Sequence, residues 1–391
     1  MSTRKEVLRS PLHHPAFRRL WLGLVISRLG DQFTVIALIW FVLQLTGSGV
    51  AIGLLVFCFQ LPTIISSLLM GKLLDRCQQR TIMAVDNFGR ACIIGAIPAL
   101  YLFGALHLWM VYVLALFNGI LSPATEVGCR LIIPRLVPDE VLEKANSLSS
   151  ISWDFATLVG PALAGILVTV IGAPNVLLLD AASFVLMGAM VLSIPHIQSL
   201  RTSMEEVENH KSLLGFGTIS RLKAVRFLTA LTLLFLFAQG LAEIAIPVYS
   251  QKTLGAGAAG YGLLMSAFGV GSLLALTLIS QFWSRNKQQG LSLAMILIMS
   301  GVLLVPLVFL RTLPVAMLFM SLAGFAAAPY YVVEQSLMQR LVPKNVQGQV
   351  CRPEYPYTRM SVKVQKNGLL MLEISVLKLE KVPESALILE K

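Results

Sequence analysis

Ten long apolar segments constrain the fold of this chain more than any other feature. They cover residues 19–44, 50–71, 82–103, 107–128, 147–171, 174–195, 226–249, 259–282, 290–310 and 313–336. A helix needs about 20 predominantly apolar residues to cross the hydrocarbon core of a bilayer, and each segment reaches that length. Backbone polar groups in lipid must be satisfied within the segment, so we expect helices and not strands. The sequence therefore predicts an all-α polytopic membrane protein.

Composition supports a membrane protein and argues against several other classes. Only 13% of the 391 residues are charged, whereas soluble proteins contain about 25%. The net charge of +11 does not indicate nucleic-acid binding, because the basic residues are dispersed in short loops. The five cysteines show no metal-binding spacing, and we expect no metal and no cofactor. The sequence contains no phosphate-binding G-x-x-x-x-G-K-[ST] motif and no Ser/His/Asp cluster, so we expect neither ATP-driven transport nor an enzyme.

The loop cations predict the orientation in the membrane. If the N-terminus is cytoplasmic, twenty Lys and Arg residues fall in cytoplasmic segments and only Lys252 and Arg311 fall outside. Cytoplasmic loops carry an excess of Lys and Arg, so this orientation is favoured. The basic segment 1–19 precedes the first span without a small-residue cleavage site, so we expect a retained helix. The prediction is a multi-pass protein of the plasma membrane.

An internal repeat predicts two halves. The tetrapeptide Arg-Leu-Val-Pro at 135–138 recurs at 340–343, and Gly-Leu-Leu at 53–55 recurs at 262–264. An offset of about half the chain is typical of transporters built from two repeats. The predicted organisation is an N-terminal six-helix bundle (1–195), a cytoplasmic linker (196–225), an incomplete C-terminal bundle of four helices (226–350) and a non-membrane tail (351–391).

Three motifs resemble those of the major facilitator superfamily. The loop after the second segment, with Gly71, Asp75, Arg76 and Arg80, resembles the family signature G-x-L-a-D-r-x-G-r-r, although Gln78 replaces a glycine. The run Gly160-Pro161-Ala162-Leu163-Ala164-Gly165 resembles the antiporter motif G-P-x-x-G-G, with Ile166 in place of the last glycine. The runs 27–32 and 45–48 resemble the bacterial branch that contains macrolide-efflux and enterobactin-export proteins.

This resemblance implies a major facilitator fold. Family members have twelve helices in two six-helix bundles around a central cavity, which is lined mainly by the first, fourth, seventh and tenth helices. One bundle rocks against the other to alternate access. About ten helices are present in this chain (six plus four), so the last two of the usual twelve are missing. The motif at Gly160, Pro161 and Gly165 also has a simpler interpretation, which is close helix packing.

Charged residues within the segments are candidate functional groups, because intramembrane charges usually face a cavity or a partner. The pairs Arg28–Asp31, Asp86–Arg90 and Glu126–Arg130 are spaced by three or four residues. Such spacing places both members on one helix face, so we expect each pair to neutralise itself in part. Asp86 and Arg90 are then structural. Asp180, close to the outer face, is expected to cap its helix at the interface.

We assign substrate or proton coupling to a smaller set. Asp31 lies near the middle of the first helix, where a carboxylate beside Arg28 can serve proton and substrate in turn. Gln239 and Glu243 share one face of the seventh helix and are expected to line the cavity. Glu334, at the inner end of the tenth helix, either contacts substrate or anchors the interface.

A cytoplasmic gate is the second predicted site. Glu126 and Arg130 are expected to brace it near the Gly71, Asp75, Arg76 and Arg80 motif. Asp154 is a further candidate for the same network.

The leading hypothesis is a proton-coupled exporter of a small amphiphilic compound, of the drug or siderophore class. It acts as a monomer in the lipid bilayer. One alternative is a truncated, non-transporting remnant or membrane scaffold. Another is an importer of the same superfamily.

The pattern of the family ends near residue 350. Residues 351–391 contain no apolar run long enough to span, and they predict either a small β-hairpin or a disordered tail. We favour a frameshift or truncation over a natural ten-helix variant. Translating the other two reading frames beyond codon 350 is expected to reveal two apolar spans. If neither frame encodes them, the frameshift hypothesis fails.

Overall fold

Helices form all the regular structure within the described residues. The computed structural model describes residues 10–194, 223–282, 289–330, 333–334 and 337. Its helices are α2 (Pro15–Thr46), α3 (Gly49–Arg76), α4 (Gln79–Leu102), α5 (Leu108–Leu121), α6 (Pro123–Leu136), α7 (Asp139–Ile171), α8 (Ala173–Leu192), α10 (Lys223–Lys252), α11 (Gly257–Phe282), α12 (Gln289–Leu304) and α13 (Leu313–Ala327), with 3-10 turns η1 (Pro11–His13) and η3 (Val305–Val308).

The predicted apolar segments coincide with these helices. Eight helices are long and apolar enough to cross a membrane, with α5 and α6 forming a single span, Leu108–Leu136. Two shorter apolar helices, Leu293–Val308 and Leu313–Ala327, match the last two predicted segments. The all-α polytopic fold is therefore confirmed. The linker up to residue 222 and the tail 351–391 lie outside the described residues, so the domain boundaries stay a prediction.

The fourth predicted segment, 107–128, is longer than expected and broken. Pro123 has no backbone N–H, so the carbonyl of Gly119 loses its usual partner in the helix. The hydroxyl of Thr63 on α3 donates to that carbonyl at 3.1 Å, and Ser66 donates at 3.4 Å. A new helix, α6, starts at Pro123 and extends to Leu136. The break is tolerated because a neighbouring helix satisfies the freed group.

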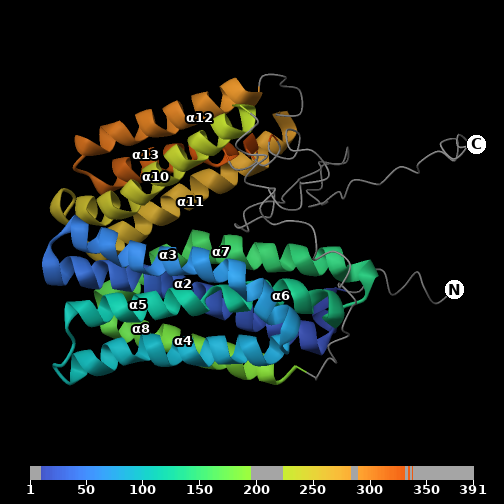
Figure 1. Cartoon of the computed structure of the whole chain (residues 1–391). Helices are drawn as coiled ribbons and strands as arrows, with labels where there is room; N and C mark the ends of the chain where they lie inside the picture. The colour runs from blue at the N-terminus through green and yellow to red at the C-terminus, as the bar shows by residue number, and fades with distance from the viewer. Residues whose placement is uncertain (1–9, 195–222, 283–288, 331–332, 335–336, 338–391) are drawn as a thin grey trace, which may run out of the picture.

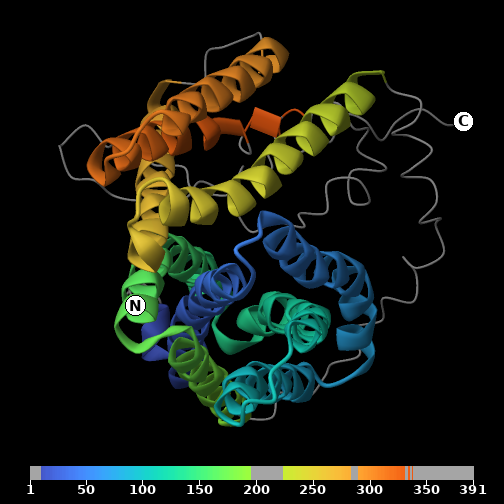
Figure 2. The same cartoon turned by 90° about the vertical axis from the view of Figure 1, so that its left-hand side faces the viewer.

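The helices form two groups that are visible in Figure 1. In one group α2 packs on α7 and α8, α4 on α8, and α3 on α5. In the other group α13 packs on α11 and α12. The groups meet mainly along α7 and α11, as the end-on view of Figure 2 shows. They also touch where the ammonium of Lys252 donates to the carbonyl of Gly47.

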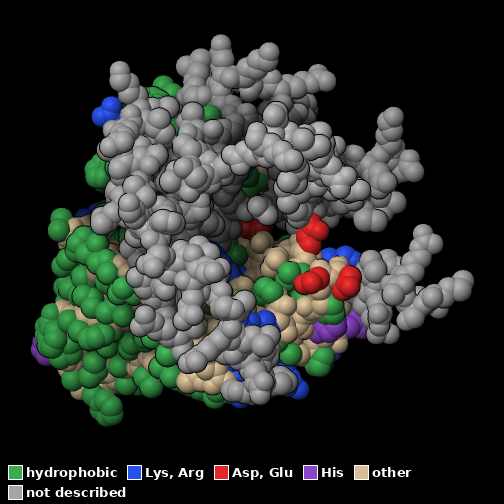
Figure 3. Space-filling view, turned by 45° about the vertical axis from the view of Figure 1, so that its right-hand side comes forward, with side chains coloured by type: hydrophobic (Ala, Val, Ile, Leu, Met, Phe, Trp, Pro, Cys, Tyr) green, Lys and Arg blue, Asp and Glu red, His purple; other side chains and the backbone are tan. Residues whose placement is uncertain are grey.

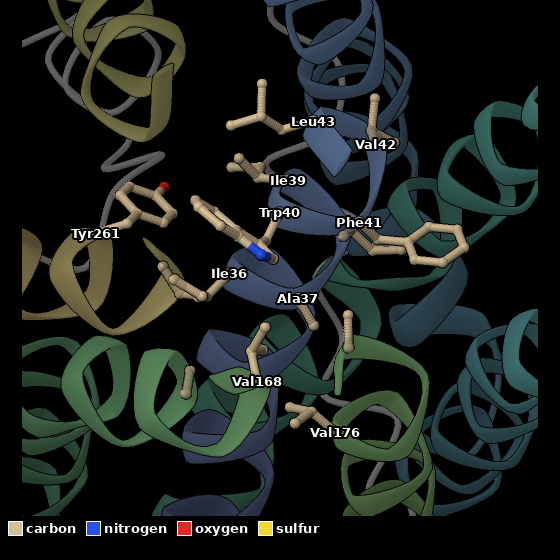
Figure 4. Packing of buried hydrophobic residues seen from close by; sticks show 14 of the residues in the cluster. Ile36, Ala37, Ile39, Trp40, Phe41, Val42, Leu43, Val168, Val176 and Tyr261 are labelled. Atoms are coloured by element: carbon tan, nitrogen blue, oxygen red, sulfur yellow. The ribbon is translucent and has the colours of Figure 1, made fainter. Parts of the chain in front are cut away.

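The C-terminal half of α2 is the centre of the largest apolar core. Trp40 points toward Tyr261 of α11, while Phe41 points to the opposite side (Figure 4). The ring of Phe41 meets that of Tyr101 on α4 edge to face, with centroids 5.6 Å apart. Consecutive residues of α2 therefore bind different neighbours, so this helix is buried on all sides along these turns.

The surface has the distribution expected of a membrane protein. On the face in Figure 3, hydrophobic side chains cover the left flank, and the acidic side chains lie to its right. Many large apolar side chains are exposed, among them Phe57, Leu69, Phe237 and Ile298. A continuous apolar flank of this kind suits contact with lipid.

The seam between α7 and α11 is a backbone contact. A Cβ atom at Gly165 would collide with the carbonyl of Ala258, and one at Gly262 would collide with the carbonyl of Pro161. Two hydrogen bonds cross the seam: the amide of Ala162 donates to the Ser266 hydroxyl at 3.0 Å, and the amide of Ala259 donates to Thr169 at 3.2 Å. Small residues allow this approach.

Replacing Gly165 with valine is expected to destabilise the protein by about 1–3 kcal/mol, because the new side chain forces the two backbones apart. Gly240→Val is the matched control, since Gly240 is also helical but a Cβ there meets nothing within 4 Å. Thermal unfolding of the purified protein in detergent measures both. Equal loss of stability in the two variants would contradict the close contact.

Candidate functional site

A buried arginine joins four helices in the first group. Arg90 lies midway along α4 and is 4% exposed. Its guanidinium donates to the carboxylate of Asp31 on α2 and, through Nε, to Asn118 Oδ1 on α5 at 2.9 Å. The guanidinium also lies 4.0 Å from the ring centre of Phe184 on α8. A charge at this depth in a membrane protein needs such partners.

The carboxylate of Asp86 completes the start of the broken helix. The first amides of a helix lack partners within that helix. Thr125 lies in the first turn of α6, and its amide donates to Asp86 Oδ2 at 3.1 Å. The Thr125 hydroxyl donates to the same oxygen, and Asn87 Nδ2 donates to that hydroxyl at 2.7 Å. Asp86 is thus a cap supplied by another helix.

Asp180 was expected near the interface, and that prediction is wrong. The residue is fully buried on α8. Its Oδ2 accepts from the Thr34 hydroxyl on α2 at 2.5 Å, and its Oδ1 accepts from Ser183 at 2.9 Å. The close approach depends on Gly30, because a Cβ there would overlap Asp180 and Ser183. Asp180 therefore belongs to the interior of the first group.

A second arginine network lies one turn from Asp31. Arg28 Nη2 pairs with Glu126 on α6 at 2.9 Å. Its Nη1 donates to the Ser149 carbonyl at 2.6 Å and to the Ser152 hydroxyl at 2.5 Å, both on α7. Asp154 interacts with Arg28 electrostatically. Arg28 thereby joins α2, α6 and α7.

The ion pairs differ from those that spacing along one helix predicted. Arg28 pairs with Glu126 and not with Asp31, and Arg90 pairs with Asp31 and not with Asp86. The ion pairs form between helices because packing brings opposite charges on different helices closer together than charges one turn apart on the same helix. The predicted Glu126–Arg130 pair is present at 3.6 Å. Arg28 thus joins the residues assigned to the gate, and its role in substrate contact stays a prediction.

The other predicted residues lie apart from Asp31. Gln239 and Glu243 are half-buried on α10, and neither side chain makes a hydrogen bond or ion pair in the described part of the chain. Glu243 interacts electrostatically with Tyr261 of α11. Glu334 accepts from Thr232 on α10 at 3.5 Å, and Tyr330 donates to the same threonine at 3.2 Å. These residues belong to the second group.

The loop motif is described only in part. Gly71, Asp75 and Arg76 lie at the end of α3, but the side chains of Asp75 and Arg76 lie outside the described residues. The guanidinium of Arg80 donates to the carbonyl of Leu192 at the end of α8. Gly160 packs against Gln32 of α2, where a Cβ would come within 2.7 Å of its side chain. Among the described residues, no group of three His, Cys, Asp or Glu side chains is placed to hold a metal ion.

Sequence reasoning undervalued Arg90 and Asp180. Their positions within single helices do not reveal their partners Asn118 and Thr34, which lie on other helices. The polar residues within the apolar segments are the signal in the sequence that could have identified these partners. A buried Thr, Ser or Asn commonly forms a hydrogen bond with a nearby buried charge.

The fold and the motifs agree with the comparison to known sequences. The profile of the Major Facilitator Superfamily matches residues 20–351. The chain belongs to the major facilitator superfamily. It is therefore related to multi-pass membrane transporters, and the resemblance found in its motifs is confirmed.

Relatives include efflux proteins at low identity. The uncharacterized MFS-type transporter y4rN of Sinorhizobium fredii is 31% identical over 272 residues, which cover 67% of this chain and 66% of that protein. Multidrug efflux pump Tap of Mycolicibacterium fortuitum is 24% identical over 358 residues, which cover 88% of this chain and 84% of that protein. Macrolide efflux protein A of Streptococcus pyogenes is 21% identical over 341 residues, which cover 85% of this chain and 83% of that protein. The predicted efflux branch is thus supported by similarity.

A solved structure shares the fold. The bacterial homologue of the iron transporter ferroportin, in an inward-facing state, superimposes with a TM-score of 0.63 at 17% identity, covering 86% of each chain. At this identity the likeness establishes the fold alone.

Arg90→Met is expected to destabilise the protein by about 3–5 kcal/mol, because it breaks the ion pair inside the bundle and leaves the Asp31 carboxylate without its cation. Arg130→Met is the control: this side chain is 45% exposed, and an exposed pair contributes about 0–1 kcal/mol. Unfolding in detergent at neutral pH compares the two. A similar small effect in both variants would show that Arg90 is not the central counter-ion.

Proposed function

We propose that this chain is a secondary active transporter that exports a small amphiphilic compound and couples export to proton entry. Asp31 carries the proposal. It lies midway along α2, and its carboxylate is 32% exposed although its partner Arg90 is buried. A carboxylate at mid-membrane depth that remains accessible marks an ion or substrate path.

The ion pair gives Asp31 two states. When the carboxylate is ionised, it neutralises Arg90. When a proton or a cationic substrate group neutralises it, Arg90 must find another partner, and the contact between α2 and α4 changes. Proton and substrate then compete for one carboxylate, so proton entry drives substrate release.

Residues of the second group supply the opposite wall of the cavity. Gln239 and Glu243 on α10 have polar side chains that no neighbour in the described part of the chain engages by hydrogen bond or ion pair. Glu334, with Tyr330 and Thr232, adds a carboxylate near one end of the same wall. We assign substrate contact to this set and proton coupling to Asp31.

Alternating access requires one group of helices to move against the other. We assign the pivot of this movement to the close contact of α7 and α11 at Gly165 and Gly262. The contact of Lys252 with Gly47 closes one end. We assign the gate at the other end to Glu126, Arg130, Arg28 and Arg80. The orientation proposed is a cytoplasmic N-terminus in the plasma membrane, with the monomer as the working unit.

The names of relatives favour export. Tap is a multidrug efflux pump, and macrolide efflux protein A is named for its substrate. Both names specify efflux, of several drugs for Tap and of macrolides for macrolide efflux protein A. Export of a drug-like molecule is therefore favoured over import.

The test is efflux of ethidium and of erythromycin from cells that express the chain, with and without a proton gradient. Asp31→Asn is expected to reduce gradient-driven efflux to the level of cells without the protein, because the neutral amide cannot exchange a proton. Glu140→Gln is the control, since Glu140 is exposed in the first turn of α7.

Undiminished gradient-driven efflux in Asp31→Asn would refute the coupling role of Asp31. Gradient-driven uptake in place of efflux would identify an importer. No movement of either compound by the wild-type chain, at normal expression and folding, would favour a non-transporting protein.

A further inference from the structure

Three carboxylates share the positive charge of Arg90. Asp31, Asp86 and Asp180 all interact with this guanidinium electrostatically, and only Asp31 forms an ion pair with it. They lie on α2, α4 and α8. If all three were ionised, the cluster would carry two uncompensated negative charges. Asp86 and Asp180 are at most 1% exposed, so water cannot screen that excess.

Two of the three carboxylates have a source of positive charge at hand. Asp31 contacts the guanidinium directly. Asp86 accepts the Thr125 amide at the start of α6, where the helix dipole contributes about half a positive charge. Even so, Asp86 Oδ1 has no hydrogen-bond partner within the described residues. Asp31 and Asp86 together therefore balance all the positive charge of the cluster, and none remains for Asp180.

Asp180 differs from both. Within the described residues, its two oxygens accept hydrogen bonds only from hydroxyl groups, those of Thr34 and Ser183. A hydroxyl group can donate or accept, so it satisfies a protonated carboxyl as well as an ionised one. Gly30 makes room for this arrangement. The surroundings of Asp180 thus offer the proton of the neutral acid a hydroxyl oxygen as its acceptor.

We propose that Asp180 is a proton-binding site and that it holds its proton in this conformation while Asp31 is ionised. The carboxyl O–H donates to one of the two hydroxyl oxygens, and the other hydroxyl donates to the second carboxyl oxygen. The cluster then contains Arg90 and the ionised Asp31 as its pair, with Asp86 balanced at the helix start.

The site responds to Asp31. The charged groups that act on Asp180 in the described part of the chain are Asp31 on α2 and Arg90 on α4, and Asp86 also acts on Arg90. When Asp31 gains a proton, Arg90 loses its counter-ion, and Asp180 releases its proton to replace it. One proton enters the cluster and one leaves, so the buried charge stays constant.

The proposal concerns a second proton site and does not require that the chain transports anything. Infrared difference spectroscopy of the purified full chain in lipid nanodiscs tests it, because the C=O stretch of a protonated carboxyl is separate from that of a carboxylate. The wild type is expected to show a protonated-carboxyl band at neutral pH that shifts in D₂O. Asp180→Asn is expected to remove this band, and Asp139→Asn, at an exposed site, to leave it.

Two further variants keep the test decisive if Asp180→Asn does not fold. Thr34→Val removes one hydroxyl partner and is expected to shift the frequency of the band. Asp31→Asn keeps Asp180 but is expected to abolish the band at neutral pH, because Asp180 then serves as the counter-ion of Arg90. A wild type without the band, a band that survives in Asp180→Asn, or a band unaffected by both Thr34→Val and Asp31→Asn would overturn the proposal.

Discussion

The guanidinium of Arg90 is the interaction on which the first group of helices depends. It is buried where water is excluded, so its charge and its N–H groups must be matched by protein atoms. Asp31, Asn118 and the face of Phe184 provide that match from α2, α5 and α8. Because one rigid, planar cation binds three helices, their relative positions are fixed by charge as well as by apolar packing.

The same requirement explains the broken span. Pro123 interrupts the backbone hydrogen bonds within the membrane-spanning part, and both sides of the break are repaired from outside. Thr63 and Ser66 of α3 donate to the free carbonyl of Gly119, and Asp86 of α4 accepts from the free amide of Thr125. The break therefore ties α5 and α6 to two neighbours, and it places Glu126 at the start of a new helix, within reach of Arg28.

The sequence was sufficient for the helices and for the family, because length, hydropathy and loop charge act locally. It was also sufficient for the pair Glu126–Arg130, whose members lie one turn apart. It failed for Arg28, Asp31 and Arg90, whose partners lie 98 and 59 residues away along the chain. Which helix faces which is a property of the packed bundle, so residues such as Asp180 could not be placed from the pattern of one helix.

The cap that Asp86 provides has a consequence for dynamics. An amide in a regular helix is protected from hydrogen exchange by its own helix, so its exchange reports local fraying. The amide of Thr125 is protected by a carboxylate on a different helix. Its exchange rate therefore measures how often α4 and α6 separate. The exchange rate of this single amide therefore reports the opening of the first group of helices, and its measurement requires no attached label.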